Sequence, residues 1–444
     1  MRNNDKTITI IGGGLAGTEA ACQLAEHGFN VKLYEMRPVK MTPAHSTGFL
    51  GELVCSNSLK SESLTTGSGL LKAELGKLGS IVIKTAEQNK IPAGNSLAVD
   101  REALARQLTE IIKQHENIDV INKEVKDIPD DRPLIIATGP LTSDSFAETL
   151  MKNLISEELF FYDAIAPVIS ADSIDYNHSF FKSRYDKGDA DYLNCPMDKE
   201  VFDLFHKELL NAEKVPLKDF EEASVFEACM PVEEMAERGE KTLTFGPLKP
   251  VGLDHPETGR KYYAVLQLRK ENKEGTAYNL VGCQTKMKIP EQKRVFGIIP
   301  ALRNAEFLRY GSIHRNTYIN SPLYLSDNYR MKDKNIYFAG QITGVEGYIE
   351  SIASGLTVAY DLIFRLSSDK QLNFPETTAL SALQRYVQEH KNKYTPSNFH
   401  FGLLPRLEEK IKKKKLKKEK MSERALKDLQ RYWADHYENR QSSR

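Results

Sequence analysis

A change of hydrophobic period near the start of the chain predicts a strand, a helix and a second strand. Residues 8–11 form an apolar, β-branched run typical of a buried strand. An Ala-rich amphipathic pattern then extends from Leu15 to Gly28, and a second strand pattern covers residues 30–34. The order of the three elements predicts a βαβ unit with parallel strands.

The turn between the first strand and the helix has glycines in G-x-G-x-x-G spacing. Such glycines allow a tight turn, close approach of the backbone to a pyrophosphate, and close packing of helix on strand. The helix N-terminus favours phosphate, and the acid after the second strand stands where it would accept ribose hydroxyls. We expect a dinucleotide here, FAD rather than NAD, although a merely tight structural turn is the alternative. The expected cofactor-binding residues are Gly12, Gly13, Gly14, Leu15, Ala16, Gly17 and Glu35.

A second glycine-rich unit lies near the other end of the chain. Residues 335–338 predict a strand, which runs into AGQITGVEGY and then a helix of small residues. This helix gives a second N-terminus that can face a flavin. The expected cofactor-binding residues here are Gly340, Gln341, Gly347 and Tyr348.

The middle of the chain has a different pattern. Helices are predicted over 69–79 and over 101–114 with Asp100 as N-cap, and strands over 118–121 and 133–138. From about 166 to 300, short strands (262–268, 278–281) mix with a helix near 199–212. We predict an α/β fold: a Rossmann-like FAD-binding domain of the two-dinucleotide type with an inserted α+β domain. The expected division is 1–165 (FAD-binding, N-terminal part), 166–299 (inserted substrate-recognition domain) and 300–444 (FAD-binding, C-terminal part with a basic helical tail).

Composition excludes several classes of protein. The 61 basic and 61 acidic residues balance, so bulk charge gives no argument for a polyanionic partner. No apolar run is long enough for a membrane span, and the N-terminus turns into the glycine loop too early for a signal peptide, so we expect a cytoplasmic protein without a membrane partner. The five cysteines are odd in number and scattered, which argues against a disulfide framework and against a metal site.

Two of the cysteines stand in contexts that suit chemistry. Cys55 lies in a long irregular segment just beyond the first βαβ unit, where loops over a rigid sheet build sites. Cys229 precedes Pro231 and a predicted helix, whose dipole would favour a thiolate. A buried structural thiol is the alternative for each. Cys22, Cys195 and Cys283 are interpreted as structural, on the first helix, in a loop and in a strand, respectively.

Two further segments could meet anionic ligands. Residues 294–321 interleave basic and aromatic side chains, which can stack on and pair with a base or with a pterin and its glutamate tail. Residues 410–420, KIKKKKLKKEK, could attract RNA phosphates. The alternative for both segments is an ordinary solvated face.

Six segments together resemble one known family, the bacterial folate- and FAD-dependent tRNA (uracil-5-)-methyltransferases. They are GGGLAGTEAA, YEMRP, ELVCSNSLKS, FEACMPVEEMAERG, HRNTYINSP and AGQITGVEGY, in this order over nearly the whole chain. The resemblance implies transfer of a one-carbon unit from 5,10-methylenetetrahydrofolate to C5 of the T-loop uridine of tRNA. Reduced FAD would supply reducing equivalents, NADPH or NADH would regenerate it, and S-adenosylmethionine would not be used. Some relatives are thought to modify ribosomal RNA, so an rRNA uridine is an alternative target.

The resemblance also implies roles for individual residues. Uracil C5 is a poor nucleophile until a thiolate adds at C6, and a base must later remove the C5 proton. Cys229 would be the nucleophile, and Cys55 the base or an organiser of the flavin site. His314 and Arg315 would hold the folate.

Two other functions are compatible with the fold. The first is an FAD oxidoreductase acting on a small molecule or a disulfide, although a disulfide reductase would carry paired cysteines. The second is a flavin-containing RNA-binding factor without turnover, for which the lysine run is the specific support.

Overall fold

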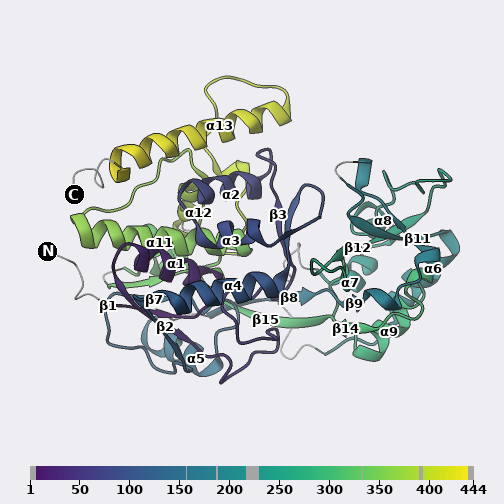
Figure 1. Ribbon diagram of the computed structural model, residues 1–444, viewed down its shortest axis with the longest axis horizontal. Coiled ribbons are helices and arrows are strands. Elements are labelled where there is room, and N and C mark those ends of the chain that lie inside the picture. The colour runs from purple at the N-terminus through teal and green to yellow at the C-terminus, as the bar shows by residue number, and fades with distance from the viewer. Residues whose placement is uncertain are drawn as a thin grey trace.

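A parallel β-sheet covered by helices forms one half of the computed structural model, and a second sheet forms the other half (Figure 1). The structure describes residues 7–156, 158–186, 189–216, 230–332, 334–389 and 394–438, without the side chains of residues 158–162, 186, 315, 437 and 438. Cys229 lies outside the described residues.

The first sheet has the strand order β16-β7-β1-β2-β6, and all its pairs are parallel. Strands β1, β7 and β16 are almost fully buried, as parallel strands between covering layers are, whereas β2 alternates and the edge strand β6 is mostly exposed or half-buried. Their bounds are β1 Thr7–Ile11, β2 Asn30–Glu35, β6 Ile118–Asn122, β7 Leu134–Ile136 and β16 Ile336–Phe338. The carboxyl ends of neighbouring parallel strands meet at one edge, where ligands bind in such folds. The glycine turn, Glu35 and the loops after β7 and β16 therefore gather at that edge.

Helices α1 (Leu15–Glu26) and α11 (Tyr348–Ser368) cross closely beside this sheet. A Cβ on Gly355 would stand 2.2 Å from the carbonyl oxygen of Ala16, so the absence of a side chain permits this approach. The other helices of this half are α2 Gly67–Lys77, α3 Ile81–Gln88, α4 Arg101–Gln114, α5 Asp144–Asn153, α10 Ser321–Tyr324, α12 Ala379–Gln388 and α13 Lys414–Trp433. A small sheet of β3 Ser58–Ser61, β4 Lys90–Ile91 and β5 Ser96–Val99 lies beside them.

The second sheet has the order β10-β11-β12-β13-β9-β14, and its strands are antiparallel. The bounds are β9 Val168–Ser170, β10 Phe180–Phe181, β11 Tyr192–Met197, β12 Ala264–Lys270, β13 Ala277–Leu280 and β14 Phe307–Arg309. Helices α6 Lys199–Asn211, α7 Val232–Glu237, α8 Glu240–Phe245 and α9 Ile289–Phe296 accompany it and share a separate hydrophobic core.

An antiparallel ribbon of β8 (Glu158–Ile165) and β15 (Ser312–Ile319) connects the two halves (Figure 1). Strand β8 leads the chain from the first half into the second, and β15 leads it back. The segments that enter and leave the second half therefore lie side by side. The predicted α/β class with a parallel sheet is confirmed, whereas the domain boundaries stay predictions.

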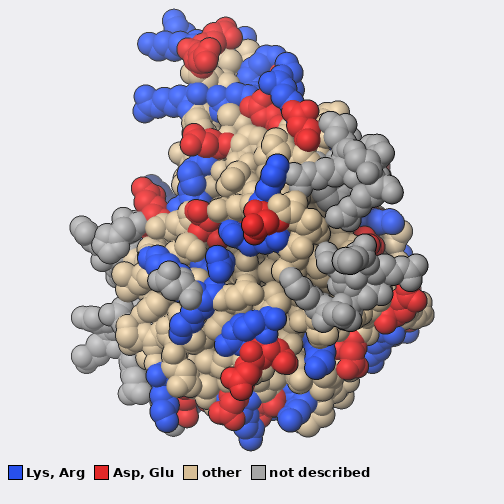
Figure 2. Space-filling model, turned by 90° about the vertical axis from the view of Figure 1, so that its left-hand side faces the viewer, with Lys and Arg blue, Asp and Glu red and all other residues tan. Residues whose placement is uncertain are grey.

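The final helix, α13, docks on the first half through Trp433. The Trp433 ring stands edge-on to Tyr360 of α11 with 4.7 Å between centroids, and it also contacts Phe364. The lysine run is split, because α13 begins only at Lys414. Figure 2 shows the lysines of this segment projecting from one end of the molecule, interspersed with acidic side chains.

Candidate functional site

The glycine turn after β1 forms the floor of a first cavity. Gly12 has φ +106°, and a Cβ there would stand 2.4 Å from the carbonyl oxygen of Ala137. Gly17 is equally constrained, since a Cβ would stand 1.9 Å from the carbonyl oxygen of Gly12. A Cβ on Gly14 would meet nothing within 4 Å, and Gly14 lines the cavity. Two glycines therefore allow close packing, and the third leaves open space above the turn.

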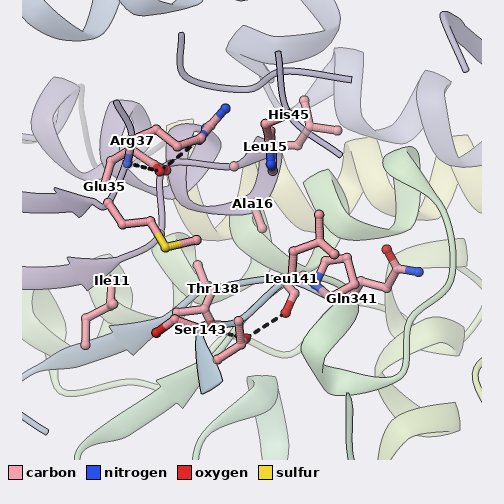
Figure 3. Close-up of a pocket in the computed structure, with 18 of the residues that line it drawn as sticks. Ile11, Leu15, Ala16, Glu35, Arg37, His45, Thr138, Leu141, Ser143 and Gln341 are labelled. Atoms are coloured by element: carbon pink, nitrogen blue, oxygen red, sulfur yellow. Dashed lines mark hydrogen bonds and ion pairs between the residues drawn. The ribbon is translucent and has the colours of Figure 1, made fainter. Parts of the chain in front are cut away.

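The first turn of α1 is suited to an anion. The helix has no side-chain N-cap and no acidic residue in its first turn. Leu15 and Ala16 line the cavity at this end (Figure 3). The N–H groups of a first helical turn have no partner within the helix, and the helix dipole favours negative charge there.

Glu35, at the end of β2, lines the same cavity and lies beside Arg37 (Figure 3). Its Oε2 accepts from the N–H of Gly13 at 2.9 Å, and its Oε1 accepts from the backbone N–H and Nε of Arg37 at 3.0 and 2.9 Å. Burial raises the pKa of Glu35, but hydrogen bonds and charge from Arg37 outweigh burial and hold it below its usual value. The carboxylate is therefore ionised and keeps acceptor capacity for a hydroxyl group.

Two loops complete the first cavity. The turn after β7 contributes Thr138 and Leu141, and the loop after β16 contributes Gly340 and Gln341. A dinucleotide needs open space over a glycine turn, helix N-terminal N–H groups without an intrahelical partner, and an ionised acid. All three are present here. The residues present therefore fit FAD. Gly13 does not line the cavity; it donates to Glu35 instead.

A second cavity of about 330 Å³ adjoins the first. Its lining comes from the segment around Cys55, the β8/β15 ribbon, the second sheet and the loop before α11. The residues that line both cavities are Val54, Pro140, Leu141, Gln341 and Tyr348. Ligands in the two cavities would therefore share this wall. Gly347, expected beside the cofactor, lines the second cavity instead of the first.

Cys55 is half-buried and lines the second cavity, whereas the other described cysteines are buried. Its N–H donates to Oη of Tyr348 at 2.8 Å, and the N–H of Ser56 donates to the same oxygen at 3.1 Å. Burial is the largest cause that raises the pKa of Tyr348 above its usual value, so the phenol stays neutral. Tyr348 therefore fixes the Cys55 backbone at the boundary between the cavities.

Residues of the second sheet also form hydrogen bonds with the Cys55 segment. Arg269 of β12 donates from Nε to Oδ1 of Asn57 and from Nη2 to Oγ of Ser56, both at 2.8 Å. Asn57 in turn donates to the carbonyl oxygen of Lys270 at 2.9 Å. These contacts join the two halves of the molecule directly beside the thiol.

Sequence reasoning missed two polar groups in the second cavity. Nδ2 of Asn279 and Oε1 of Gln284 are buried and have no hydrogen-bond partner among the described residues, and both side chains line the cavity. Buried polar atoms normally have partners, so these atoms are suited to a bound ligand. No local motif marks either residue, because only the folded sheet brings them to the cavity.

His314 of β15 also lines the second cavity. Its Nε2 and Oγ of Ser312 lie 2.9 Å apart. Burial, followed by the charge of Arg309, lowers the pKa of His314, so the imidazole is neutral at pH 7. The backbone of Arg315 pairs with Tyr162 in the ribbon, and its side chain lies outside the described part. Arg294, at the start of the same aromatic and basic segment, instead forms ion pairs with Glu208 and Glu291.

The remaining cysteines are structural by position. Cys22 lies on α1 and is buried, as predicted. Cys195 lies within β11 and not in a loop, and Cys283 follows β13 instead of lying in it. Burial raises the pKa of both thiols, which belong to the core of the second half. Cys229, predicted as the nucleophile, lies outside the described residues; it precedes Pro231, the N-cap of α7.

Two further features are absent from the described ranges. No helix there has the length and apolar character that a bilayer crossing requires. No group of three or more His, Cys, Asp or Glu side chains is arranged to hold a metal ion in the same part of the chain.

Comparison with known proteins identifies the family. The model of the family described as glucose inhibited division protein A (GIDA) matches residues 7–369. A methylenetetrahydrofolate–tRNA-(uracil-5-)-methyltransferase TrmFO from Natranaerobius thermophilus is 56% identical over 96% of this chain and 98% of its own length. The protein of the same name from Aquifex aeolicus is 54% identical over 96% of both chains. Aquifex aeolicus GidA, in its form I crystal, has the same fold with a TM-score of 0.66 at 13% identity, covering 96% of this chain and 78% of that one. The resemblance read from the sequence is confirmed: the chain belongs to the methylenetetrahydrofolate–tRNA-(uracil-5-)-methyltransferase family, within the GIDA family.

Proposed function

We propose that this protein is an enzyme that transfers the one-carbon unit of 5,10-methylenetetrahydrofolate to C5 of the T-loop uridine of tRNA, forming 5-methyluridine in the cytoplasm. One observation carries the proposal beyond the name of the relatives. The cavity over the glycine turn and the cavity beside Cys55 share a wall that includes Gln341 and Tyr348. A flavin and a folate bound in these cavities would lie next to each other.

The first cavity would hold FAD. The amides at Leu15 and Ala16 would bind the diphosphate, and Glu35 would accept hydrogen bonds from the ribose hydroxyls. The bound FAD, reduced by NADPH or NADH, would supply the electrons that convert a methylene unit into a methyl group.

The second cavity would hold the folate. A neutral imidazole at His314 can lie flat against a pterin without the cost of burying a charge. The amide groups of Asn279 and Gln284 would pair with polar edges of the bound ligand. Arg315 would meet the glutamate tail of the folate, because guanidinium groups pair well with carboxylates.

The two thiols would act on the uracil in turn. The thiolate of Cys229 would add to C6, which makes C5 nucleophilic. Cys55 would remove the C5 proton after the carbon is attached, or would organise the flavin site. The hydrogen bonds from Cys55 and Ser56 to Tyr348 support either role, because they hold the thiol at the cavity wall.

A covalent trap tests the assignment. RNA with 5-fluorouridine at the target has no removable C5 proton, so the adduct should accumulate and survive a denaturing gel when enzyme, folate and NADPH are present. Cys229→Ala should abolish the adduct, while Cys55→Ala, provided it retains FAD, should still form it without turnover. An adduct lost with Cys55 and kept without Cys229 would reverse the two roles.

The same trap identifies the RNA. Substituted tRNA and a substituted ribosomal RNA fragment should be compared at equal concentration, and we expect the adduct with tRNA. An adduct formed only with the ribosomal fragment would move the same chemistry to rRNA. No adduct with either RNA would favour an oxidoreductase that acts on a small molecule.

A further inference from the structure

Glu346 places a carboxyl group in the second cavity. It lies directly before α11, is 5% exposed, and lines the cavity together with Cys55 and His314. Nε2 of Gln341 donates to its Oε2 at 2.7 Å, and Gln341 lines both cavities. The acid is thus linked by one hydrogen bond to the wall that the two cavities share.

The backbone of Glu346 is fixed by a neighbouring segment. Its N–H donates to the carbonyl oxygen of Ser397 at 2.9 Å, and its carbonyl oxygen accepts from Nδ2 of Asn398. Because both backbone groups are held, the carboxyl group stays at the cavity.

The charged groups around Glu346 come from three elements. Asp163 of β8 and Glu350 of α11 add negative charge, and Lys60 of β3 opposes them. Burial is the largest cause, and together with Asp163 it raises the pKa of Glu346 to about 8. The carboxyl group is therefore mainly protonated at pH 7, and a buried acid of this kind can donate a proton.

The proposed reaction needs such a donor. The one-carbon unit of methylenetetrahydrofolate bridges N5 and N10, and the C–N10 bond breaks readily only when N10 receives a proton. His314 is neutral, because its pKa is lowered, and Cys55 is assigned to proton removal or to organising the site. None of the residues assigned so far supplies this proton.

We propose that Glu346 is the general acid that protonates N10 of the folate, with Gln341 as the residue that positions it. The carboxyl proton moves to N10, the C–N10 bond breaks with its electron pair on N10, and the N5 lone pair forms a double bond to the carbon. Glu346 becomes a carboxylate. The proton that is later removed from uracil C5 replaces the proton that Glu346 has lost, so the enzyme returns to its starting protonation state. This inference rests on the proposed function.

The test compares two glutamates of one segment. Glu346→Gln retains polarity but has no transferable proton. Glu350→Gln is the matched control, because Glu350 is also buried, accepts from the N–H of Phe399 at 3.1 Å, and does not line the second cavity. Single-turnover methyl transfer to tRNA is measured from pH 6 to 10, together with FAD content and tetrahydrofolate affinity.

The expected result is specific to a proton donor. Glu346→Gln should lower the transfer rate by about 100-fold or more while FAD content and folate affinity stay within about threefold. Wild-type activity should decline above about pH 8, and the residual activity of Glu346→Gln should lack that decline. Glu350→Gln should keep the wild-type rate near pH 6, with a decline that begins at lower pH because the charge of Glu350 contributes to the raised pKa of Glu346. A rate for Glu346→Gln close to wild type, a parallel loss of folate affinity, or an equal loss in Glu350→Gln would overturn the inference. Wild-type protein that forms no 5-methyluridine would overturn the proposed function, and the inference with it.

Discussion

Tyr348 holds Cys55 at the boundary between the two cavities, because its phenolic oxygen accepts the N–H of Cys55 at 2.8 Å. The two residues are 293 positions apart in the sequence. The N-terminal loop that carries the thiol and the helix α11 near the other end of the chain are thus joined at the candidate site. The same oxygen accepts the N–H of Ser56, so one side chain orders two consecutive peptide groups.

Tyr348→Phe should loosen this loop without removing the ring from the cavity wall. Each lost hydrogen bond is worth about 0.5–1.5 kcal/mol, so we expect turnover to fall by about tenfold. Alkylation of Cys55 by iodoacetamide, followed by peptide mass spectrometry, should become several times faster. Tyr360→Phe is the control, because it removes a hydrogen bond to Leu78 from the same helix, away from both cavities. An unchanged alkylation rate in Tyr348→Phe would refute the anchoring role.

Gly14→Leu should yield folded, colourless protein. A Cβ at Gly14 meets no atom within 4 Å and φ is −73°, so the side chain fits the backbone but projects into the space proposed for the diphosphate. Absorbance near 450 nm and thermal unfolding of the purified variant check both points. Gly76→Leu on α2 is matched, since a Cβ there also meets nothing within 4 Å. A normal flavin spectrum in Gly14→Leu would mean that the turn is only structural.

Arg37→Met should destabilise the protein in a pH-dependent manner. Arg37 is 2% exposed and pairs with Glu35 and Glu52 at 2.9 and 3.1 Å. Its loss leaves two buried carboxylates uncompensated, at a cost of about 3–5 kcal/mol near pH 7. Arg37 holds the pKa of Glu35 low in the native state, so this stabilisation is present above the ordinary value of 4.5 and is lost as pH falls below it.

Urea unfolding of flavin-free protein at pH 7 and pH 4 measures the effect. The difference between wild type and Arg37→Met should be largest at pH 7 and should shrink at pH 4. Arg106→Met removes an exposed pair with Glu102 and should change the free energy of unfolding by less than about 1 kcal/mol. A difference that grows toward pH 4 would contradict the assignment of charges.

His314→Ala should weaken folate binding and leave FAD in place. His314 lines the second cavity but not the first, and its neutral ring provides a flat surface for a pterin. Fluorescence titration with tetrahydrofolate should show a loss of about tenfold, as expected for one stacking contact of about 1 kcal/mol or slightly more. His206→Ala on α6, away from both cavities, should bind folate normally. Unchanged affinity in His314→Ala would return this segment to a structural role.

The sequence predicted those helices and turns whose formation depends on residues close to one another in the chain. The helix at Arg101–Gln114 was predicted with its bounds, and Asp100 caps it by accepting the N–H of Ala103 at 2.9 Å. The glycine spacing and the acid at Glu35 predicted the first cavity. A capping side chain and a tight turn depend on residues close in sequence, which is why such features can be predicted without a structure.

Features that depend on distant pairing could not be predicted in this way. Cys195 was expected in a loop because Pro196 follows it, yet β11 tolerates the proline where its pairing with β10 has already ended at Asn194. Asn279 reaches the second cavity only through the folded second sheet, and its sequence context resembles any half-buried strand. The contact between Tyr348 and Cys55 likewise requires the complete fold.

The most direct test of the proposed function is the transfer reaction. Purified yellow protein is incubated with methylenetetrahydrofolate labelled in its methylene carbon, NADPH and unmodified tRNA, and the RNA is then digested to nucleosides. We predict labelled 5-methyluridine, formed in proportion to tRNA, absent without folate or NADPH, and unaffected by S-adenosylmethionine. Label that stays entirely in folate while the protein retains FAD and oxidises NADPH would contradict the central claim.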